Sequence, residues 1–359
     1  ESPEDYSNDS WIWARGVGST ANYDHTPGAV AKDSRGNSYI AGTYRAYDLQ
    51  LGDVRLPRSI NNGESIYVAK LDPTGEVEWA EHTFGTHNGR NDAVTGMVVS
   101  DDGSVYLTGH YENPTNFGSI HLENGQSGSQ TSFVAKLSQQ GRWEWATSAD
   151  SSSETWDRFF DISIVDDGLI LAGDCYGGTN YHGDIQLDCP ESAYGATVAK
   201  ISLDGEWIWA SVADGGNGCS AYGVATDFEG DAMITGKFSE NCIFGTTTLD
   251  TGGNNNDVFV AKVDGESGDW LWAERAGSDS REDIGYDVDI DNSGNGFVTG
   301  YFDGSADFGN TTLTSVSPDP FVARISPSGV WDWATSMSSA AYSQGVSLDV
   351  APSGSVLVA

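Results

Sequence analysis

One short phrase recurs six times along the 359-residue chain, and this repetition constrains the fold more than any other feature. The phrase is Trp-x-Trp-Ala, with Val in place of the first Trp in one copy. Its copies span residues 11–14, 77–80, 143–146, 207–210, 270–273 and 331–334. From one copy to the next, the second Trp advances by 66, 66, 64, 63 and 61 residues. So regular a spacing predicts a fold that repeats one supersecondary unit.

Two further markers have the same period and the same order within each unit. An aromatic residue or Thr, followed by Val-Ala and a cation, ends at Lys70, Lys136, Lys200, Lys262 and Arg324. Ala-Gly or Thr-Gly ends at Gly42, Gly109, Gly173, Gly236 and Gly300. Three markers in one order and one period rule out coincidence, so the chain is a repeat protein.

Each unit contains four short runs of β-branched and aromatic residues separated by turn residues. In the unit at residues 29–80 the runs are 30–33, 38–44, 66–71 and 76–80, with Gly-containing turns at 34–37 and 72–75. Such runs predict strands, and the chain lacks the sustained 3.6-residue apolar period of long helices. Four-stranded antiparallel units at a fixed period predict an all-β fold, a β-propeller in which each unit is one blade.

Connection lengths indicate the order of strands within a blade. To pass from one blade's outermost strand to the next blade's innermost strand, the chain must cross roughly 14 Å, at about 4.8 Å between strands. Only the long segment after Trp-x-Trp-Ala reaches that far comfortably. The strand at 30–33 is therefore predicted to be innermost and the Trp strand outermost, and five full blades end at residues 80, 146, 210, 273 and 334.

We predict six blades in a single propeller domain at residues 11–359, preceded by an extension at residues 1–10. The last blade would combine strands at 345–350 and 355–359 with the Trp strand at 11–14, and its third strand is missing. A chain cut short is the favoured explanation. The alternatives are a seven-bladed ring, an open array and a strand donated by a neighbouring chain. Residues 1–5, acidic and without Met, fit a processed or excised segment.

The repeat phrases at residues 257–262, 270–273 and 291–301 resemble the β-propeller repeats of bacterial and archaeal secreted and surface proteins. The resemblance extends over nearly all of residues 11–359. That family is often described as seven-bladed, whereas this chain counts to nearly six. The resemblance implies the propeller fold and an extracellular or cell-surface location. It implies no particular chemistry, because the shared motif is structural.

Four cysteines lie close together in two neighbouring units: Cys175, Cys189, Cys219 and Cys242. None belongs to a C-x-x-C motif, which argues against a zinc ribbon or a thioredoxin-like site. An even, clustered set in an acidic chain rich in Gly, Asn, Ser and Thr favours disulfides outside the cytoplasm over four reduced thiols. We predict the pairs Cys175–Cys189 and Cys219–Cys242, with all four residues in long loops.

The chain is strongly acidic, since 53 Asp and Glu residues face 17 Lys and Arg residues and the net charge is 17 − 53 = −36. Nucleic-acid phosphates and anionic lipid headgroups would repel it, so neither is an expected partner. No apolar run approaches the roughly 18 residues of a membrane span, which argues against membrane insertion. Aromatic residues make up 11% of the chain, too many for a disordered acidic tail.

The net charge also predicts that salt stabilises the folded protein, as suits a saline habitat. Repulsion among the carboxylates destabilises a compact chain, and molar salt screens charges beyond roughly 3 Å. We expect the melting temperature to rise between low and molar NaCl. A melting temperature that stays constant over this range, measured by circular dichroism, would contradict the expectation.

A carboxylate recurs about six residues before the innermost strand in four units: Asp24, Asp92, Asp157 and Asp283. Ser220 and Ser343 take its place in two other units. A ring of carboxylates at a channel mouth could hold Ca²⁺, which prefers oxygen ligands, so Ca²⁺ is the one cofactor that the sequence suggests. The favoured alternative is that each Asp caps its own loop by accepting backbone N–H bonds.

No pattern in the sequence indicates a catalytic site. H-E-x-x-H, G-x-S-x-G and phosphate-binding motifs are missing, and the six His residues show no ligand spacing. The segment at 202–207 resembles the Asp-box turn of sialidase propellers, one residue shorter, but that turn is structural and the Arg residues do not repeat in register. An enzyme is therefore disfavoured. The outer-strand Trp residues are predicted to pack between blades rather than to form a sugar platform.

Three functions are consistent with the sequence. The favoured one is a non-catalytic extracellular or cell-surface propeller that binds a glycan or a surface protein in adhesion. Its basis is the repeat, the secreted character and the lack of a catalytic constellation. A structural subunit of a surface layer or filament is the first alternative, because an open last blade leaves a strand edge for self-association. A polysaccharide hydrolase or lyase is the second alternative.

Overall fold

The structure is a computed structural model. It describes residues 14, 17–19, 26–45, 48–58, 63–85, 92–123, 130–151, 156–253, 255–278, 281–338, 341–351 and 353–359. Strands joined by turns make up the regular structure of these ranges. Within them, no helix has the length and the apolar character that crossing a membrane requires. The predicted all-β fold is confirmed.

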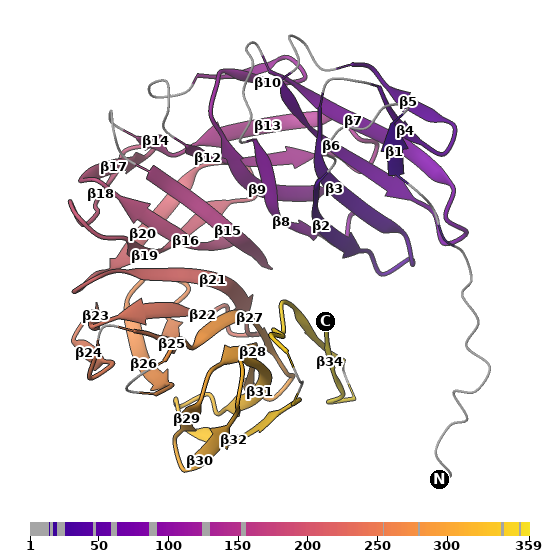
Figure 1. Cartoon of the computed structure of the whole chain (residues 1–359). Helices are drawn as coiled ribbons and strands as arrows, with labels where there is room; N and C mark the ends of the chain where they lie inside the picture. Colours follow the sequence, from indigo (N-terminus) through magenta and orange to yellow (C-terminus); the bar gives the residue numbers. More distant parts are fainter. Residues whose placement is uncertain are drawn as a thin grey trace, which may run out of the picture.

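Four-stranded antiparallel blades follow one another along the chain. From the inside outwards, blade 1 consists of β2 (Thr26–Lys32), β3 (Ser38–Arg45), β6 (Glu64–Leu71) and β7 (Val77–Gly85), and blade 2 of β8 (Ala93–Val99), β9 (Val105–Tyr111), β12 (Thr131–Leu137) and β13 (Trp143–Ser148). Blade 3 consists of β15 (Trp156–Val165), β16 (Gly168–Tyr176), β19 (Gly195–Ser202) and β20 (Trp207–Ala213), and blade 4 of β21 (Cys219–Thr226), β22 (Ala232–Ser239), β25 (Asn256–Val263) and β26 (Trp270–Ala276). Blade 5 consists of β27 (Ile284–Ile290), β28 (Gly296–Phe302), β31 (Asp319–Ile325) and β32 (Trp331–Ser336). The inner strands β2, β8, β15, β21 and β27 lie side by side around a common axis (Figure 1). The fold is a β-propeller, and the predicted strand order within a blade is confirmed.

A two-stranded hairpin packs beside β27, where a further blade would begin (Figure 1). It consists of β33 (Leu348–Val350) and β34 (Val356–Val358). The Trp strand that was predicted to close this blade lies outside the described residues, apart from Ala14. The number of blades therefore stays a prediction.

A small hairpin joins the second and third strands of each of these five blades, where the sequence indicated only a long connection. The hairpins are β4–β5 (Leu49–Leu51, Val54–Leu56), β10–β11 (Thr115–Phe117, Ile120–Leu122), β17–β18 (Thr179–His182, Ile185–Asp188), β23–β24 (Asn241–Phe244, Thr247–Asp250) and β29–β30 (Ser305–Phe308, Thr311–Thr314). Each hairpin pairs with the chain just ahead of its own blade. β1 (Val17–Ser19) pairs with β4, β7 with β10, and β14 (Asp150–Ser151) with β17. Single bridges repeat this contact in blades 4 and 5. The hairpins thereby tie neighbouring blades together.

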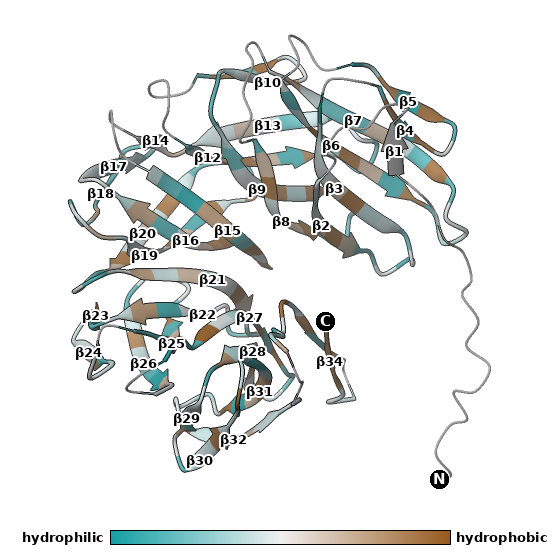
Figure 2. Ribbon diagram, in the orientation of Figure 1, coloured by the Kyte–Doolittle hydropathy of each residue, from teal (hydrophilic) through white to brown (hydrophobic). Residues whose placement is uncertain are grey.

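The second repeated marker is explained by burial of the third strand. Its Val and Ala are buried in all five blades: Val68, Ala69, Val134, Ala135, Val198, Ala199, Val260, Ala261, Val322 and Ala323. Figure 2 shows apolar segments on the strands of these blades. A third strand has a neighbouring strand on each side and packs against an adjacent blade, so apolar residues fit best at these positions.

The two Trp positions of the first marker have different roles. The second Trp donates its Nε1–H to a turn of the next blade, 3.0–3.2 Å away, in four pairs: Trp79 to Gln139, Trp145 to Leu203, Trp209 to Gly265 and Trp272 to Pro327. This position packs between blades, as predicted. The first Trp packs on the hairpin of its own blade, as Trp143 does on Phe117 with ring centroids 4.9 Å apart.

Both predicted disulfides are present, Cys175–Cys189 and Cys219–Cys242, with Cα–Cα distances of 5.7 and 6.3 Å. Their placement in loops holds for Cys189, which follows β18, and was wrong for the other three. Cys175 lies in β16, Cys219 begins β21 and Cys242 lies in β23, because the supposed loops fold as hairpins and strand ends. Each bond fastens an inner or second strand to the hairpin of the same blade.

The third marker, Ala/Thr-Gly, lies opposite a bulge in the inner strand of every blade. In blade 4, Gly236 pairs with Ala221, and the register shifts between Ala221 and Gly223 so that Tyr222 has no cross-strand partner. A Cβ on Gly236 would lie 1.9 Å from the carbonyl oxygen of Ser220. Glycine is therefore required because the inner strand approaches too closely for any side chain.

Candidate functional site

Blades 3, 4 and 5 place aromatic side chains at the bulged position of the inner strand. The bulge residues are Phe160, Tyr222 and Tyr286, whereas blades 1 and 2 carry Gly28 and Thr95 there. A bulge leaves its residue without a cross-strand partner and re-aims the side chain. The ring of Phe160 lies 5.3 Å from that of Tyr222, which lies 5.9 Å from that of Tyr286. The bulges therefore bring rings from three blades into contact.

Two more tyrosines extend this row of rings. Tyr301, near the end of β28, lies 6.0 Å from Tyr286 and 5.6 Å from Tyr342, between ring centroids. We call Phe160, Tyr222, Tyr286, Tyr301 and Tyr342 the aromatic wall. Tyr301 is buried, Tyr342 is 58% exposed, and the three bulge residues are half-buried. Burial and the neighbouring Tyr342 raise the pKa of Tyr286 to about 12, so its hydroxyl stays neutral.

A clamped arginine holds the Phe160 end of the aromatic wall in place. The guanidinium of Arg158 lies 5.2 Å from the rings of Phe160 and Tyr194. Its Nε and Nη2 donate hydrogen bonds to Asp174, at 3.0 and 2.9 Å. Asp174 also accepts the hydroxyl of Ser220 at 3.0 Å. A bidentate ion pair with a third donor fixes the guanidinium, and the rings that stack on it are held with it.

The aromatic wall cannot be found from residues that repeat along the sequence. Three of its residues occupy the bulge position, which differs from unit to unit, although the glycine opposite it is the same in every unit. The bulge position reads Gly28, Thr95, Phe160, Tyr222 and Tyr286. Comparing the units position by position, and asking which position varies next to the Ala/Thr-Gly partner, would have found it.

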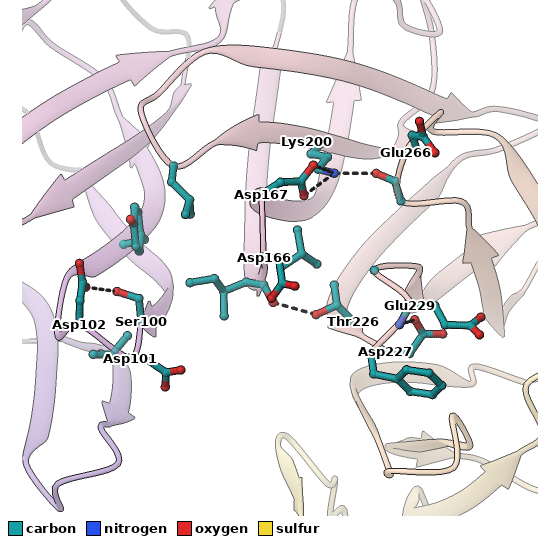
Figure 3. Close-up of a pocket in the computed structure, with 18 residues that line it drawn as sticks. Ser100, Asp101, Asp102, Asp166, Asp167, Lys200, Thr226, Asp227, Glu229 and Glu266 are labelled. Carbon is teal, nitrogen blue, oxygen red and sulfur yellow. Dashed lines mark hydrogen bonds and ion pairs between the residues drawn. The ribbon is translucent and has the colours of Figure 1, made fainter.

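A cavity of about 840 Å³ lies at the other end of the inner strands of blades 2 to 4 (Figure 3). The turns between first and second strands, and between third and fourth strands, surround it. Lys200 lies among its acidic residues: Asp101, Asp102, Asp166, Asp167, Asp227, Glu229 and Glu266. The exposed ring of Phe228 stands at its edge.

Turn geometry accounts for most of the carboxylates around this cavity. Asp227 accepts the backbone N–H groups of Glu229 and Asp231, at 3.0 and 3.1 Å. The ammonium of Lys262 lies 2.9 Å from Asp227 and 3.1 Å from Asp231. Among the described residues, Asp227, Glu229 and Asp231 are the one group of three that gathers possible metal ligands within 4.8 Å. The ammonium of Lys262 pairs with two of the three carboxylates, so these contacts account for the cluster without a metal ion.

The predicted carboxylate ring is spread over separate blades. Asp24 lies outside the described residues. Asp92 accepts the backbone N–H of Glu112 at 3.2 Å. Asp283 accepts those of Ser278 and Asp303, at 2.9 and 3.0 Å. Each of these two carboxylates thus caps loops of its own blade. The structure does not place the described aspartates in a converging group, and a Ca²⁺ ion at the ring stays a prediction.

The strand register shows that Ser220 does not occupy the position of Asp157 and Asp283. Asp157 lies in β15, 3.2 Å from His182 Nε2, and both side chains are fully buried. The residue three places before the bulge is Asp157 in blade 3 and Asp283 in blade 5, but in blade 4 it is Cys219, not Ser220. Where blades 2, 3 and 5 have a carboxylate at the start of the inner strand (Asp92 in blade 2), blade 4 has a disulfide. This favours a structural role for the position.

Half-buried aspartates link neighbouring inner strands. Asp161 of β15 accepts the backbone N–H of Val224 in β21 at 2.9 Å. Asp287 and Asp289 of β27 accept those of Leu348 and Val350, each at 2.7 Å. These carboxylates satisfy backbone donors at the inner edge of the next blade, which would otherwise be unpaired.

The same burial predicts that stability falls as pH rises. Burial raises the pKa of Asp92, Asp161 and Asp283 to about 7, against an ordinary value of 3.8. Between these values the folded state binds more protons, so their contribution is full below about pH 3.8 and is lost as pH rises through about 7. We expect a higher urea midpoint at pH 5 than at pH 8, and a shallower dependence in Asp161→Asn. A midpoint at pH 8 equal to or above that at pH 5 would contradict this.

No protein-family model and no curated protein matches the chain. Among solved structures it is similar to a protein of unknown function from Bacteroides caccae, at 9% identity over 87% of this chain and 82% of that chain, with a TM-score of 0.43. It is also similar to the Pan2 WD40 domain from Neurospora crassa, at 10% identity over 92% of this chain and 84% of that chain, with a TM-score of 0.36. A third similar structure is a K499G mutant of NanB sialidase from Streptococcus pneumoniae, at 10% identity over 96% of this chain and 66% of that chain, with a TM-score of 0.41. Proteins of such different kinds assign no activity to this chain.

Proposed function

We propose that the chain is a non-catalytic, extracellular or cell-surface propeller that binds a glycan through the aromatic wall, as a module for adhesion. The observation that carries this proposal is the unbroken row of ring contacts from Phe160 to Tyr342. A sugar has apolar C–H faces edged by hydroxyls, and tyrosine offers a ring face and a hydroxyl to match. A row of rings suits an extended chain of sugars better than one small molecule.

The extracellular location has its own support. Two disulfides suit an oxidising compartment. The net charge of −36 suits an exposed protein in a saline medium, and the repeats resemble those of secreted and surface propellers. A surface protein is the alternative ligand for the same wall, since tyrosine is also enriched where proteins bind one another.

A glycan array probed with the labelled full chain tests the proposal, followed by affinity measurement on the glycans it retains. We expect Tyr222→Ala and Tyr286→Ala to weaken binding by about 10-fold or more, because each removes a ring from the middle of the wall. Tyr181→Ala is the matched control, since that tyrosine is 42% exposed on hairpin strand β17 and makes no contact with the wall. Retention of no glycan, or full retention by Tyr222→Ala, would refute the proposal.

A further inference from the structure

One lysine of blade 4 lies against the aromatic wall. Lys237 is half-buried on β22, directly after the marker glycine Gly236. Its ammonium lies 5.9 Å from the ring centroid of Tyr222. The corresponding residues of the neighbouring blades are Asp174 and Tyr301, so this position also varies from unit to unit.

Two other lysines make the same contact with a tyrosine ring, and both also have a carboxylate. Lys70 lies 5.8 Å from the ring of Tyr39 and 2.8 Å from Glu78. Lys136 lies 5.5 Å from the ring of Tyr106 and 3.1 Å from Glu144. Lys237, by contrast, has no carboxylate oxygen within 4.0 Å among the residues that the structure describes. At Lys237 the ring and the ammonium are present, but no described carboxylate takes the place that Glu78 and Glu144 have beside the other two lysines.

The aspartate that contacts the serine opposite Lys237 has other partners. Lys237 lies opposite Ser220 in the sheet. Ser220 donates its hydroxyl to Asp174, whose two oxygens receive the guanidinium of Arg158. Asp174 is thus held by two partners and is directed toward Arg158. An ammonium that lies on a ring face without a counter-ion attracts an anionic group.

We infer that the glycan is acidic, and that Lys237 binds the carboxylate of a uronic-acid residue whose sugar ring lies on the aromatic wall. This inference rests on the proposed glycan-binding function. The net charge of −36 weakens the binding of any polyanion, but charges beyond about 8 Å are screened at physiological ionic strength, so the ammonium of Lys237 can bind a carboxylate locally. At Lys237 the ammonium and the ligand carboxylate meet within hydrogen-bond distance, where screening is weak.

The test compares oligogalacturonate with its methyl ester, which lacks the negative charge and carries one additional methyl group on each carboxyl. Binding of each to the full chain is measured by calorimetry for the wild type, Lys237→Met and Lys237→Arg. We expect Lys237→Met to weaken binding of the free acid by about 10-fold and to leave the ester unchanged. Lys237→Arg should keep most of the affinity. Lys32→Met, which removes the same charge from exposed β2, should have no effect.

The possible results separate the two proposals. If the ester binds as tightly as the acid, and Tyr222→Ala weakens both, the acidic-sugar inference is overturned and glycan binding stands. Equal binding of dextran sulfate would indicate general attraction of anions and would also overturn the inference. If neither form of the oligosaccharide is bound, and the array retains no other glycan, both proposals fail.

Discussion

Replacing Gly236 by Ala is expected to lower the free energy of unfolding by more than about 3 kcal/mol. The added Cβ would lie 1.9 Å from the carbonyl oxygen of Ser220 and 2.9 Å from the Cα of Ala221. Both atoms belong to the backbone of the inner strand, so no flexible side chain can move aside. The clash would push β21 away from β22 at the bulge, where the two strands pair.

Gly85→Ala is the matched control for this substitution. A Cβ there would come no closer than 3.5 Å to another residue, the carbonyl oxygen of Glu64. Urea unfolding followed by tryptophan fluorescence measures both variants, and we expect Gly85→Ala to stay within about 0.5 kcal/mol of the wild type. If Gly236→Ala unfolds at the wild-type midpoint, the close-approach explanation of the third marker is wrong.

The same glycine links the fold to the proposed function. Gly236 permits the bulge that frees Tyr222 from cross-strand pairing, and the bulge directs its ring to Phe160 and Tyr286. The glycine must therefore repeat in every blade, whereas the bulge residue can change without cost to the sheet. A repeat protein can carry ligand-binding residues at such a position, because the packing of the repeated unit does not depend on which residue stands there.

Strand order and disulfide pairs were predictable because each depends on a short, local pattern. The Val-Ala of the third strand, for example Val260 and Ala261, needs apolar residues in every unit, so the same letters return at one period. The cysteine pairs were predictable because both partners of each pair lie within one unit. Cys219 and Cys242 are 23 residues apart, and Cys175 and Cys189 are 14 apart.

The hairpins and the aromatic wall were not predictable by the same reasoning. The strands β23 and β24 have four residues each, too few for their alternation to stand out from a loop. The wall residues come from positions 160, 222, 286, 301 and 342, and no repeated residue type marks them. Phe160, Tyr222 and Tyr286 meet because successive inner strands lie side by side and each is bulged at the same height, whereas Tyr301 comes from β28. The aspartates at 92, 157 and 283 recur in sequence without forming a group in space, since a recurring residue on a repeat serves each blade separately.

Loss of the Cys219–Cys242 disulfide is expected to cost about 3 kcal/mol in the free energy of unfolding. The bond joins residues 23 apart in the chain, so its removal releases a loop in the unfolded state. In the folded state it fastens the start of β21 to β23, at the position where blades 3 and 5 use Asp157 and Asp283. The double variant Cys219→Ala/Cys242→Ala therefore loses both the cross-link and the fastening of the inner strand.

Two comparisons separate these contributions. Reduction of the Cys175→Ala/Cys189→Ala variant breaks only the Cys219–Cys242 bond and keeps both of its sulfur atoms, whereas the blade 4 double variant also leaves two small buried gaps. Because both cysteines are buried, reduction requires unfolding in urea with reductant before refolding. Cys175→Ala/Cys189→Ala, which opens a shorter 14-residue span, should cost somewhat less than the blade 4 variant. A loss below about 1 kcal/mol in the blade 4 variant would show that packing around β21, rather than the cross-link, holds the start of the inner strand.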